Sequence, residues 1–296
     1  MFIDLNYYKD KPRIATGKKT RPSSIYKPNQ PDDFKISRSR FQNFKDCKRC
    51  FYLDLVRGYV APDSIPQKLN SLTDTLLKKE FDLCRKKNNP HRLLKKNKKL
   101  QHIIPYKNDN HAKNIYEKLI VHSKTKKPYK LLDAWRSTHH GLQRRFKNTN
   151  IILYGIIDDV WQNKKTNELI LADYKSQQSK VEVTQENYFE SVYKKAYETQ
   201  MNFYFYLLNG DIKKINNIKN EVSKDTYFYV MNAKGLEDGF NGKLLFEEKI
   251  IHHRVNIDGL EKEIQEMVDT INSEKIPESA FNCINCAYAK IRSRIE

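Results

Sequence analysis

Apolar residues recur at helical spacing through much of the first half of this 296-residue chain. One helical stretch begins near Ser37 or Ser39 and ends at Gly58, as expected for a serine cap and a glycine stop. A second runs from Leu69 to Lys86, and the pattern from His111 to Phe146 is also mostly helical. The first half is therefore predicted to be mainly helical.

The second half contains the predicted strands. Residues 151–161 and 168–176 are rich in β-branched and aromatic residues, and the short polar turn QNKKTN separates them. This pattern predicts a β-hairpin. The elements predicted after it are a helix over 185–210 that Asn209 and Gly210 end, a strand over 225–235 and a helix over 257–273.

Composition divides the chain at about residue 34. Residues 1–34 are polar and basic without a sustained period, which predicts a mobile tail. Residues 35–296 are predicted to form one domain with a helical insertion at about 85–146. The start lacks an apolar signal-peptide core, and no stretch approaches the length of a membrane span, so we expect a cytoplasmic protein with no membrane partner.

The charge favours a polyanionic partner. The chain has 55 lysines and arginines against 36 acidic residues, a formal net charge of +19. Such a balance suits nucleic acid, because each phosphate that is neutralised releases counterions. The alternative is a merely solvated basic surface. The dense positive segment Arg85–Lys99, predicted as a loop and a short helix, either follows a DNA backbone or is a solvated run of charge.

The predicted hairpin carries carboxylates. Side chains alternate along a strand, so Asp173 and Lys175 share one face, and Asp158 lies in the partner strand. Two carboxylates on adjacent strands repel each other, and a divalent cation such as Mg²⁺ or Mn²⁺ removes that penalty. Lys175 would then orient or deprotonate a metal-bound water, or neutralise charge on phosphorus. The alternative is an ordinary ion pair at a sheet end, which contributes only ~0–1 kcal/mol.

The helix after the hairpin has a stripe of polar aromatic residues. Tyr193, Tyr197, Gln200 and Tyr204 are spaced by four, three and four residues, which places them on one side of a helix. A tyrosine stripe is usually core packing. A glutamine within it is less expected, because its amide needs hydrogen-bond partners.

Three short motifs follow one another in predicted strand, strand and helix: Gly155-x-x-Asp158, Asp173-x-Lys175 and Gln200-x-x-x-Tyr204. Together they resemble the PD-(D/E)XK nuclease superfamily, and in particular its RecB-type branch, over about residues 37–286. The resemblance implies an α/β fold with a restriction-endonuclease-like core, in which helices flank a central mixed β-sheet. It also implies phosphodiester hydrolysis that depends on Mg²⁺ or Mn²⁺.

The same resemblance implies a role for each motif residue. Asp158 and Asp173 look like metal ligands and Lys175 like the catalytic lysine, while Gln200 and Tyr204 look like residues that position the substrate.

RecB-type nucleases also take a histidine or an acid from an early helix as a metal ligand. The matching segment, LNSLTDTLLKKEFD, contains no histidine. Asp74 fits the motif position best. Glu80 is the alternative, because a helical wheel places it among four leucines, where an acid is out of place without a role.

Two C-x-x-C pairs lie near opposite ends of the predicted domain, Cys47 with Cys50 and Cys283 with Cys286. This spacing lets both thiolates of a pair reach one metal centre, and disulfides are not expected inside a cell. The segment around the first pair resembles that of RecB-type nucleases with an iron–sulfur cluster, in which one early cysteine joins three late ones. The resemblance favours a [4Fe–4S] cluster, but only two cysteines are late here and Cys50 would be the fourth ligand, which leaves zinc open as well. Free buried cysteines are the third alternative, and Cys84 alone is predicted to be core.

We therefore predict a metal-dependent nuclease that cleaves DNA at an end or in a single strand, during processing, repair or recombination. A helicase or another recombination protein would be a separate chain, since no Gly-rich ATPase loop is visible. The alternatives are a non-catalytic DNA-binding module with a Cys₄ metal site and a purely structural zinc protein, which leaves the hairpin acids unexplained. The pairs His139–His140 and His252–His253 are predicted to be surface.

Overall fold

The computed structural model describes residues 7–8, 11–12, 14–61, 67–213, 218–235 and 239–295. Contacts within the chain divide it into two compact units. The terminal unit comprises Met1–Pro66, Asn148–Ile151 and Gly259–Glu296, and the central unit comprises Gln67–Lys147 and Ile152–Asp258. The tail over 1–34 and the single domain over 35–296 stay predictions, and residues 1–6, 9, 10 and 13 of that tail lie outside the described residues.

Short strands and helices from both ends of the chain build the terminal unit. Its elements are β1 (Tyr7–Tyr8), β2 (Lys11–Pro12), the 3-10 helix η1 (Pro22–Ser24), β3 (Phe34–Ser37), α1 (Arg38–Asp46), α2 (Lys48–Leu55), α7 (Leu260–Asn272) and α8 (Ile284–Arg292). Helix α7 packs against α1 and α2. In the core, the rings of Phe44 and Phe51 meet edge to face with centroids 5.4 Å apart. The helix predicted over 257–273 is confirmed as α7.

The helix predicted from Ser37 to Gly58 is interrupted. Ser37 caps α1, since its hydroxyl accepts the backbone N–H of Arg40 at 3.3 Å. The backbone then becomes extended at Cys47 (φ −161°, ψ 107°), and α2 begins at Lys48. The prediction of one continuous helix is therefore wrong. The physical reason is the placement of the cysteine sulfurs, described below.

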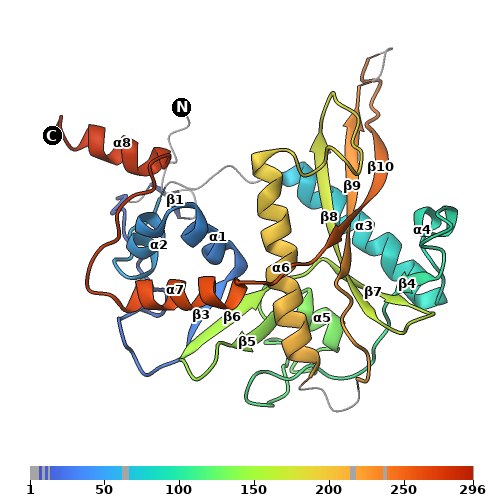
Figure 1. The fold of residues 1–296 in the computed structure, drawn as a ribbon, viewed down its shortest axis with the longest axis horizontal. Helices are drawn as coiled ribbons and strands as arrows, with labels where there is room; N and C mark the ends of the chain where they lie inside the picture. The colour runs from blue at the N-terminus through green and yellow to red at the C-terminus, as the bar shows by residue number, and fades with distance from the viewer. Residues whose placement is uncertain are drawn as a thin grey trace. The chain divides into compact units, whose positions relative to one another are not determined.

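A mixed five-stranded sheet with helices packed on it builds the central unit (Figure 1). The elements are α3 (Lys68–Lys87), α4 (Arg92–Lys96), β4 (Ile103–Pro105), α5 (Leu131–Trp135), β5 (Leu142–Arg145), most of β6 (Ile151–Gly155), β7 (Asp159–Asn163), β8 (Leu169–Gln178), α6 (Val192–Ile212), β9 (Asp225–Lys234) and β10 (Leu245–Arg254). The strand order is β10-β9-β8-β7-β4; β8 and β9 are parallel, and the other neighbours are antiparallel. Helix α6 connects the parallel pair, as such a crossover requires. The predicted mixed α/β fold is confirmed.

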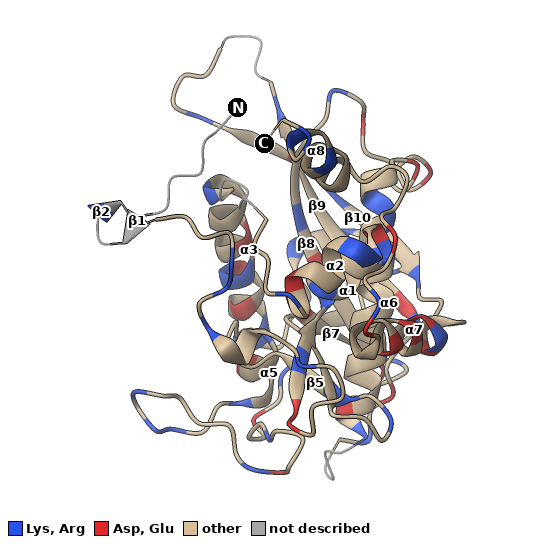
Figure 2. Ribbon diagram, turned by 90° about the vertical axis from the view of Figure 1, so that its left-hand side faces the viewer, with Lys and Arg blue, Asp and Glu red and all other residues tan. Residues whose placement is uncertain are grey.

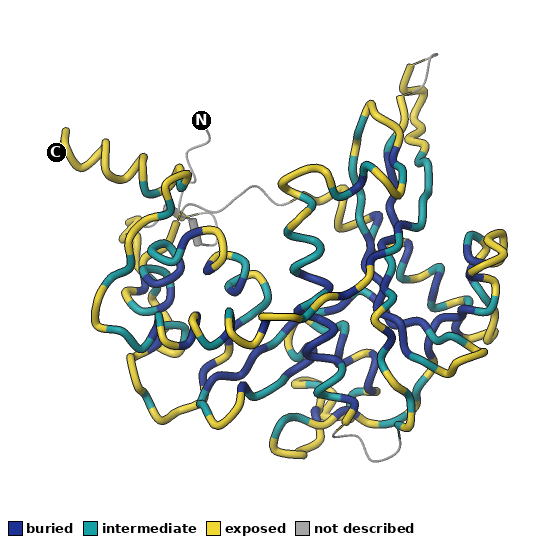
Figure 3. The backbone as a smooth tube through the Cα atoms, in the orientation of Figure 1, coloured by how far each residue is buried: buried dark blue, intermediate teal, exposed yellow. Residues whose placement is uncertain are grey.

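The core of the central unit lies where α3 packs on β8 and β4. Phe81 of α3 stacks on Trp161 of β7 with ring centroids 5.3 Å apart, and Leu77, Tyr174 and Tyr229 complete this cluster. The first six residues of β8 are buried on both faces, which Figure 3 shows as a continuous dark segment. Burial on both faces explains why this strand has an uninterrupted apolar run rather than an alternating pattern.

The predicted hairpin is confirmed with one correction. Strands β7 and β8 pair antiparallel, with Asp159 opposite Ala172. The first predicted strand is split, however: β6 ends at Gly155 and pairs with β5, and β7 begins at Asp159. Asp158 therefore lies in the bend between two strands and not within one.

The prediction of a mostly helical stretch over 111–146, and with it a helical insertion at 85–146, is wrong. Beyond the end of α3 this stretch contains the five-residue helices α4 and α5, strands β4 and β5, and turns. An isolated bridge joins His111 to Lys130, and Glu117 closes a turn with φ +60°. The lysine-rich sequence between the strands has too few apolar residues to bury a helical face, so tertiary contacts decide its path.

Helix α6 differs from its prediction at both ends. It begins at Val192, later than expected, and it continues through Asn209 and Gly210 to Ile212. Gly210 does not end the helix. A Cβ at that position would lie 2.6 Å from Cδ of Arg144, so the glycine permits a close approach between α6 and β5.

The strand predicted over 225–235 is confirmed as β9, whereas β10 was not predicted. Strand β10 pairs with β9 along its whole length. His252 is partly exposed, but the prediction that His253 is surface is wrong: it is 8% exposed, and burial lowers its pKa to about 4. Within the described residues, no helix has the length and apolarity needed to cross a membrane.

Candidate functional site

The bend between β6 and β7 presents the Asp158 carboxylate at the edge of α3 and β8. The backbone N–H of Tyr174 donates to Asp158 Oδ2 at 2.9 Å, and the ammonium of Lys78 donates to Oδ1 at 2.9 Å. One oxygen is thus fixed by the backbone of β8 and the other by a side chain of α3. The split strand therefore places the carboxylate in a defined orientation.

Asp173 is the second carboxylate, and it is only 2% exposed on β8. Its Oδ1 accepts a hydrogen bond of 2.6 Å from the Gln200 amide, and its Oδ2 is paired with Lys175. The Lys175 ammonium also lies 4.6 Å from the centroid of the Tyr197 ring, a cation–π distance. The glutamine within the tyrosine stripe of α6 thus has its partner in the hairpin acid.

The early helix adds Asp74 beside Lys78. These residues are four apart on α3, and the Lys78 ammonium donates to Asp74 Oδ2 at 2.9 Å as well as to Asp158. Asp74 Oδ1 is buried and has no hydrogen-bond partner in the part of the chain that the structure describes. A buried carboxylate oxygen of this kind is costly unless a further cation binds it. Asp74 therefore lies with the hairpin acids.

Glu80, the alternative to Asp74, makes different contacts. Its Oε1 lies 2.8 Å from His91 Nε2 and accepts a hydrogen bond of 3.1 Å from Arg92 Nε. These two contacts account for an acid among the leucines of α3. They belong to the segment around α4 and not to the carboxylate group.

Burial and the neighbouring charges shift the pKa values of the group. Burial alone would raise the pKa of Asp158, but Lys78 and Lys175 outweigh it and lower that pKa. Burial would likewise lower the lysine pKa values, but Asp158 raises the pKa of Lys78, and Asp173 and Asp158 raise that of Lys175. The pKa of Asp74 is raised by burial and by Asp158. Both lysines are thus held as ammonium ions at neutral pH.

Tyr204 and Gly155 are in direct contact. A Cβ at Gly155 would lie 2.5 Å from Cε1 of the Tyr204 ring, so only glycine fits between α6 and β6 at this point. Tyr204 is nearly buried, and it packs on the strand end that leads to Asp158. Tyr193, the first residue of the predicted stripe, is 88% exposed and lies outside this packing.

Asp159 is a buried residue of this region that sequence analysis missed. It is fully buried; Arg85 pairs with its Oδ1, and the Tyr174 hydroxyl donates to its Oδ2 at 2.8 Å. Asp158 and Asp159 therefore serve opposite sides of β7, one toward the carboxylate group and one toward the core. Lys78 was missed as well. Its spacing of four from Asp74 was the available signal.

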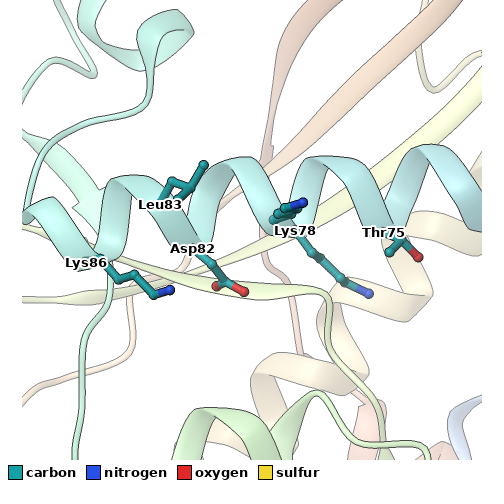
Figure 4. A pocket seen from close by; sticks show the side chains of 6 residues that line it. Thr75, Lys78, Asp82, Leu83 and Lys86 are labelled. Carbon is teal, nitrogen blue, oxygen red and sulfur yellow. The ribbon is translucent and has the colours of Figure 1, made fainter.

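Two open cavities run beside α3. One, of about 390 Å³, is lined by Thr75, Lys78, Lys79, Asp82, Leu83 and Lys86. The other, of about 350 Å³, shares Asp82 and Lys86 with it and adds Lys107, Lys130 and Arg136 among others. Figure 4 shows Lys78, Asp82 and Lys86 along one side of the helix, and Figure 2 shows acidic and basic positions mixed along α3. We call the two cavities together the α3 trough; it begins at Lys78, beside the carboxylates.

The four paired cysteines meet within the terminal unit. Cys47 is the N-cap of α2 and Cys283 the N-cap of α8, and Cys50 and Cys286 follow in the first turn of the same helices. The sulfur of Cys50 lies 3.5 Å from that of Cys283 and 3.4 Å from that of Cys286, and the sulfurs of Cys47 and Cys286 are 3.8 Å apart. All four lie within 4.8 Å of one another. The break at Cys47 thus starts a new helix, and the first turn of that helix directs two thiols to one point. The fifth cysteine, Cys84, lies apart from this group and is half-buried.

Hydrogen bonds set the pKa of Cys47. Burial would raise it, but the backbone N–H groups of Cys50 and Ala280 donate to its sulfur and lower the pKa to about 7. Burial and the neighbouring thiols raise the pKa of Cys286 to about 11. One thiol of the group is therefore already close to ionisation at neutral pH.

The donor atoms decide which cations fit each group. Oxygen ligands from Asp74, Asp158 and Asp173 suit Mg²⁺ or Mn²⁺, whereas four thiolates suit a soft metal centre. Among the described residues, only the cysteines gather metal-binding atoms within 4.8 Å of one another. The three carboxylates instead have the ammonium groups of Lys78 and Lys175 between them.

Comparison with known families places the chain in one of them. A family model described as the PD-(D/E)XK nuclease superfamily matches residues 35–291. No curated protein matches the chain.

Replacing Asp159 with asparagine is expected to destabilise the central unit by about 1–3 kcal/mol, because it removes the fully buried carboxylate that pairs with Arg85 and leaves that arginine only Asp82, which is partly exposed, as an ion-pair partner. Asp109→Asn is the matched control. Its carboxylate pairs with Lys130 at the surface, so little change is expected. Urea unfolding of both variants measures the difference, and equal stability losses would contradict the buried role of Asp159.

Proposed function

The chain belongs to the PD-(D/E)XK nuclease superfamily, and we propose that it is a metal-dependent nuclease that hydrolyses phosphodiester bonds in DNA. The observation that supports this most is the ordered group of Asp158, Asp173 and Lys175 at one end of the β7–β8 hairpin. Buried carboxylates are costly unless they are paired or bind a cation, and a purely structural role leaves this arrangement unexplained. Hydrolysis of phosphodiester bonds is the activity of most members of this superfamily, and we propose the same activity for this chain.

Asp74, Asp158 and Asp173 are proposed to hold the divalent cation, Mg²⁺ or Mn²⁺. Once bound, it would lower the pKa of a coordinated water and neutralise charge on the phosphate. Asp74 is preferred to Glu80, because its Oδ1 is buried and without a hydrogen-bond partner among the described residues, whereas Glu80 is occupied by His91 and Arg92.

Lys175 is proposed to stabilise negative charge rather than to act as a base. Asp173 and Asp158 raise its pKa, so it carries its proton throughout the neutral range. A base must be able to lose that proton near the working pH. A fixed ammonium beside the scissile phosphate instead neutralises charge that develops in the transition state.

Gln200 and Tyr204 are proposed to position the catalytic groups. The Gln200 amide holds Asp173 Oδ1, which leaves Oδ2 toward Lys175. Tyr204 packs on Gly155 and so fixes the end of β6 before Asp158. Both residues act through the carboxylates that they orient.

The substrate is proposed to be DNA with a free end or a single strand, lying along the α3 trough. Lys78, Lys79 and Lys86 line its first cavity next to the carboxylates, and Lys107 and Lys130 line the second. Cavities of this size suit a flexible single strand whose phosphates contact lysines in succession. A RecB-type role in repair or recombination, with a helicase on another chain, is part of the same proposal.

Asp173→Asn and Lys175→Ala are expected to reduce cleavage at least ~10²-fold, because the first removes a charged ligand of the cation and the second removes a fixed positive charge beside the reacting phosphate. The assay uses labelled single-stranded and duplex DNA with Mg²⁺, Mn²⁺ or EDTA. Lys249→Ala, which removes an exposed lysine of β10, is the control and should cleave like the unchanged protein. Full turnover in both site variants would exclude this site.

Salt should weaken DNA binding steeply. If about six phosphates are neutralised, the slope of log affinity against log salt on single strands is expected to be about −4 to −5. Lys86→Gln or Lys107→Gln should each reduce the slope by about 0.7. Lys165→Gln, in the turn of the hairpin, should leave it unchanged. Equal slopes for all variants would argue against the trough as the binding path.

Lys78→Met should make the protein less stable without divalent cations and more responsive to them. The variant leaves Asp74 and Asp158 without their shared ammonium, at a cost of about 1–2 kcal/mol, because the pair is 21–22% exposed at Lys78 and Asp158. Mg²⁺ or Mn²⁺ should then raise the melting temperature more than in the unchanged protein.

The matched control for this measurement is Lys79→Met, which removes the neighbouring exposed lysine of the same cavity. It should melt and respond to Mg²⁺ like the unchanged protein. If both variants respond alike, the carboxylates next to Lys78 do not share a cation.

A further inference from the structure

We infer that the four-cysteine centre of the terminal unit binds a single tetrahedral zinc ion and not an iron–sulfur cluster. This inference is independent of the nuclease proposal, because the cysteines and the carboxylates belong to different units. It favours the zinc alternative over the [4Fe–4S] cluster that the sequence resemblance favoured.

The distances between the sulfurs fit one shared ion. Zinc binds thiolate sulfur at about 2.3 Å, so the corners of a regular ZnS₄ tetrahedron lie about 3.8 Å apart. Cys50 lies 3.5 Å from Cys283 and 3.4 Å from Cys286, and Cys47 lies 3.8 Å from Cys286, sulfur to sulfur. The remaining pairs lie within 4.8 Å. All four sulfurs are thus close enough to be ligands of one centre.

The same distances do not fit a cluster. In a [4Fe–4S] cubane each thiolate binds a different iron. Two sulfurs are then separated by two iron–sulfur bonds and an iron–iron edge, farther than two ligands of one ion. A [2Fe–2S] centre would bring the sulfurs together only in two separate pairs. Here Cys50 is close to both Cys283 and Cys286, and Cys286 is also close to Cys47, so the contacts link both C-x-x-C pairs.

The local structure repeats at both pairs. Each first cysteine caps a helix, and each second cysteine lies three residues later in its first turn. Both thiolates of a pair thus face the positive end of a helix dipole, which stabilises their negative charge. The backbone N–H of Ala280 also donates to the Cys47 sulfur at 3.5 Å. Two such turns meeting at one point make a closed four-thiolate site, the kind that structural zinc occupies.

The metal content of the full-length protein tests this assignment. The chain is produced with both iron and zinc supplied, purified without oxygen, and analysed for iron, zinc and acid-labile sulfide. We expect one zinc per chain, no sulfide and a colourless solution. Iron with sulfide in cluster stoichiometry, a single iron without sulfide, or no bound metal would each overturn the inference.

Three cysteine variants complete the test without any measurement of nuclease activity. Cys283→Ser should lose the zinc and melt at a lower temperature, whereas Cys84→Ser, the control outside the centre, should keep both. Cys286→His should retain one zinc, because zinc accepts three thiolates and one imidazole in its structural sites. Retention of stoichiometric zinc by Cys283→Ser with unchanged melting, or loss of zinc from Cys286→His while the protein stays folded, would contradict the assignment.

Discussion

Mutual repulsion of the carboxylates is the constraint on which the central unit depends. Asp74, Asp158 and Asp173 come from α3, the bend before β7, and β8, and their charges are tolerated only because Lys78 and Lys175 lie among them. The sheet and α3 are therefore held together at this edge by electrostatics as well as by the apolar core of Phe81 and Trp161. A divalent cation that joins this group meets carboxylates that are already paired with ammonium groups, so its binding depends on how readily Lys78 moves away from Asp74 and Asp158.

The terminal unit meets the same kind of constraint with other chemistry. Its thiols lie at the first turns of α2 and α8, where the positive ends of the helix dipoles stabilise the negative charge of ionised sulfur. The candidate ligands of the two units thus differ in type: carboxylate oxygens with lysine partners in one, and thiols at helix ends in the other. Neither group needs the ligands of the other to be complete.

The features that depend on the spacing of neighbouring residues were correctly predicted from the sequence. The hairpin, the limits of α3 and the C-x-x-C pairs followed from alternation, helical period and ligand spacing. The features that the sequence analysis missed depend on contacts between distant segments. Strand β10 forms along β9, and residues 111–146 lack an apolar face of their own. Gly210 permits the close approach of Arg144 and does not end its helix. Asp159 was missed for the same reason, since its partner Arg85 lies in another element, whereas Lys78 carried a local signal in its spacing of four from Asp74.

The adjacent residues Asp158 and Asp159 are chemically identical, and only their surroundings distinguish them. Arg85 and the Tyr174 hydroxyl donate hydrogen bonds to Asp159 in the core, while the Tyr174 backbone N–H donates to Asp158 outside it. A slip of β7 by one residue against β8 would exchange the two carboxylates and turn every side chain of the strand to the opposite face. Such a slip would remove Asp159 from Arg85 and from the Tyr174 hydroxyl, so these buried contacts favour the one alignment of the hairpin that also orients Asp158.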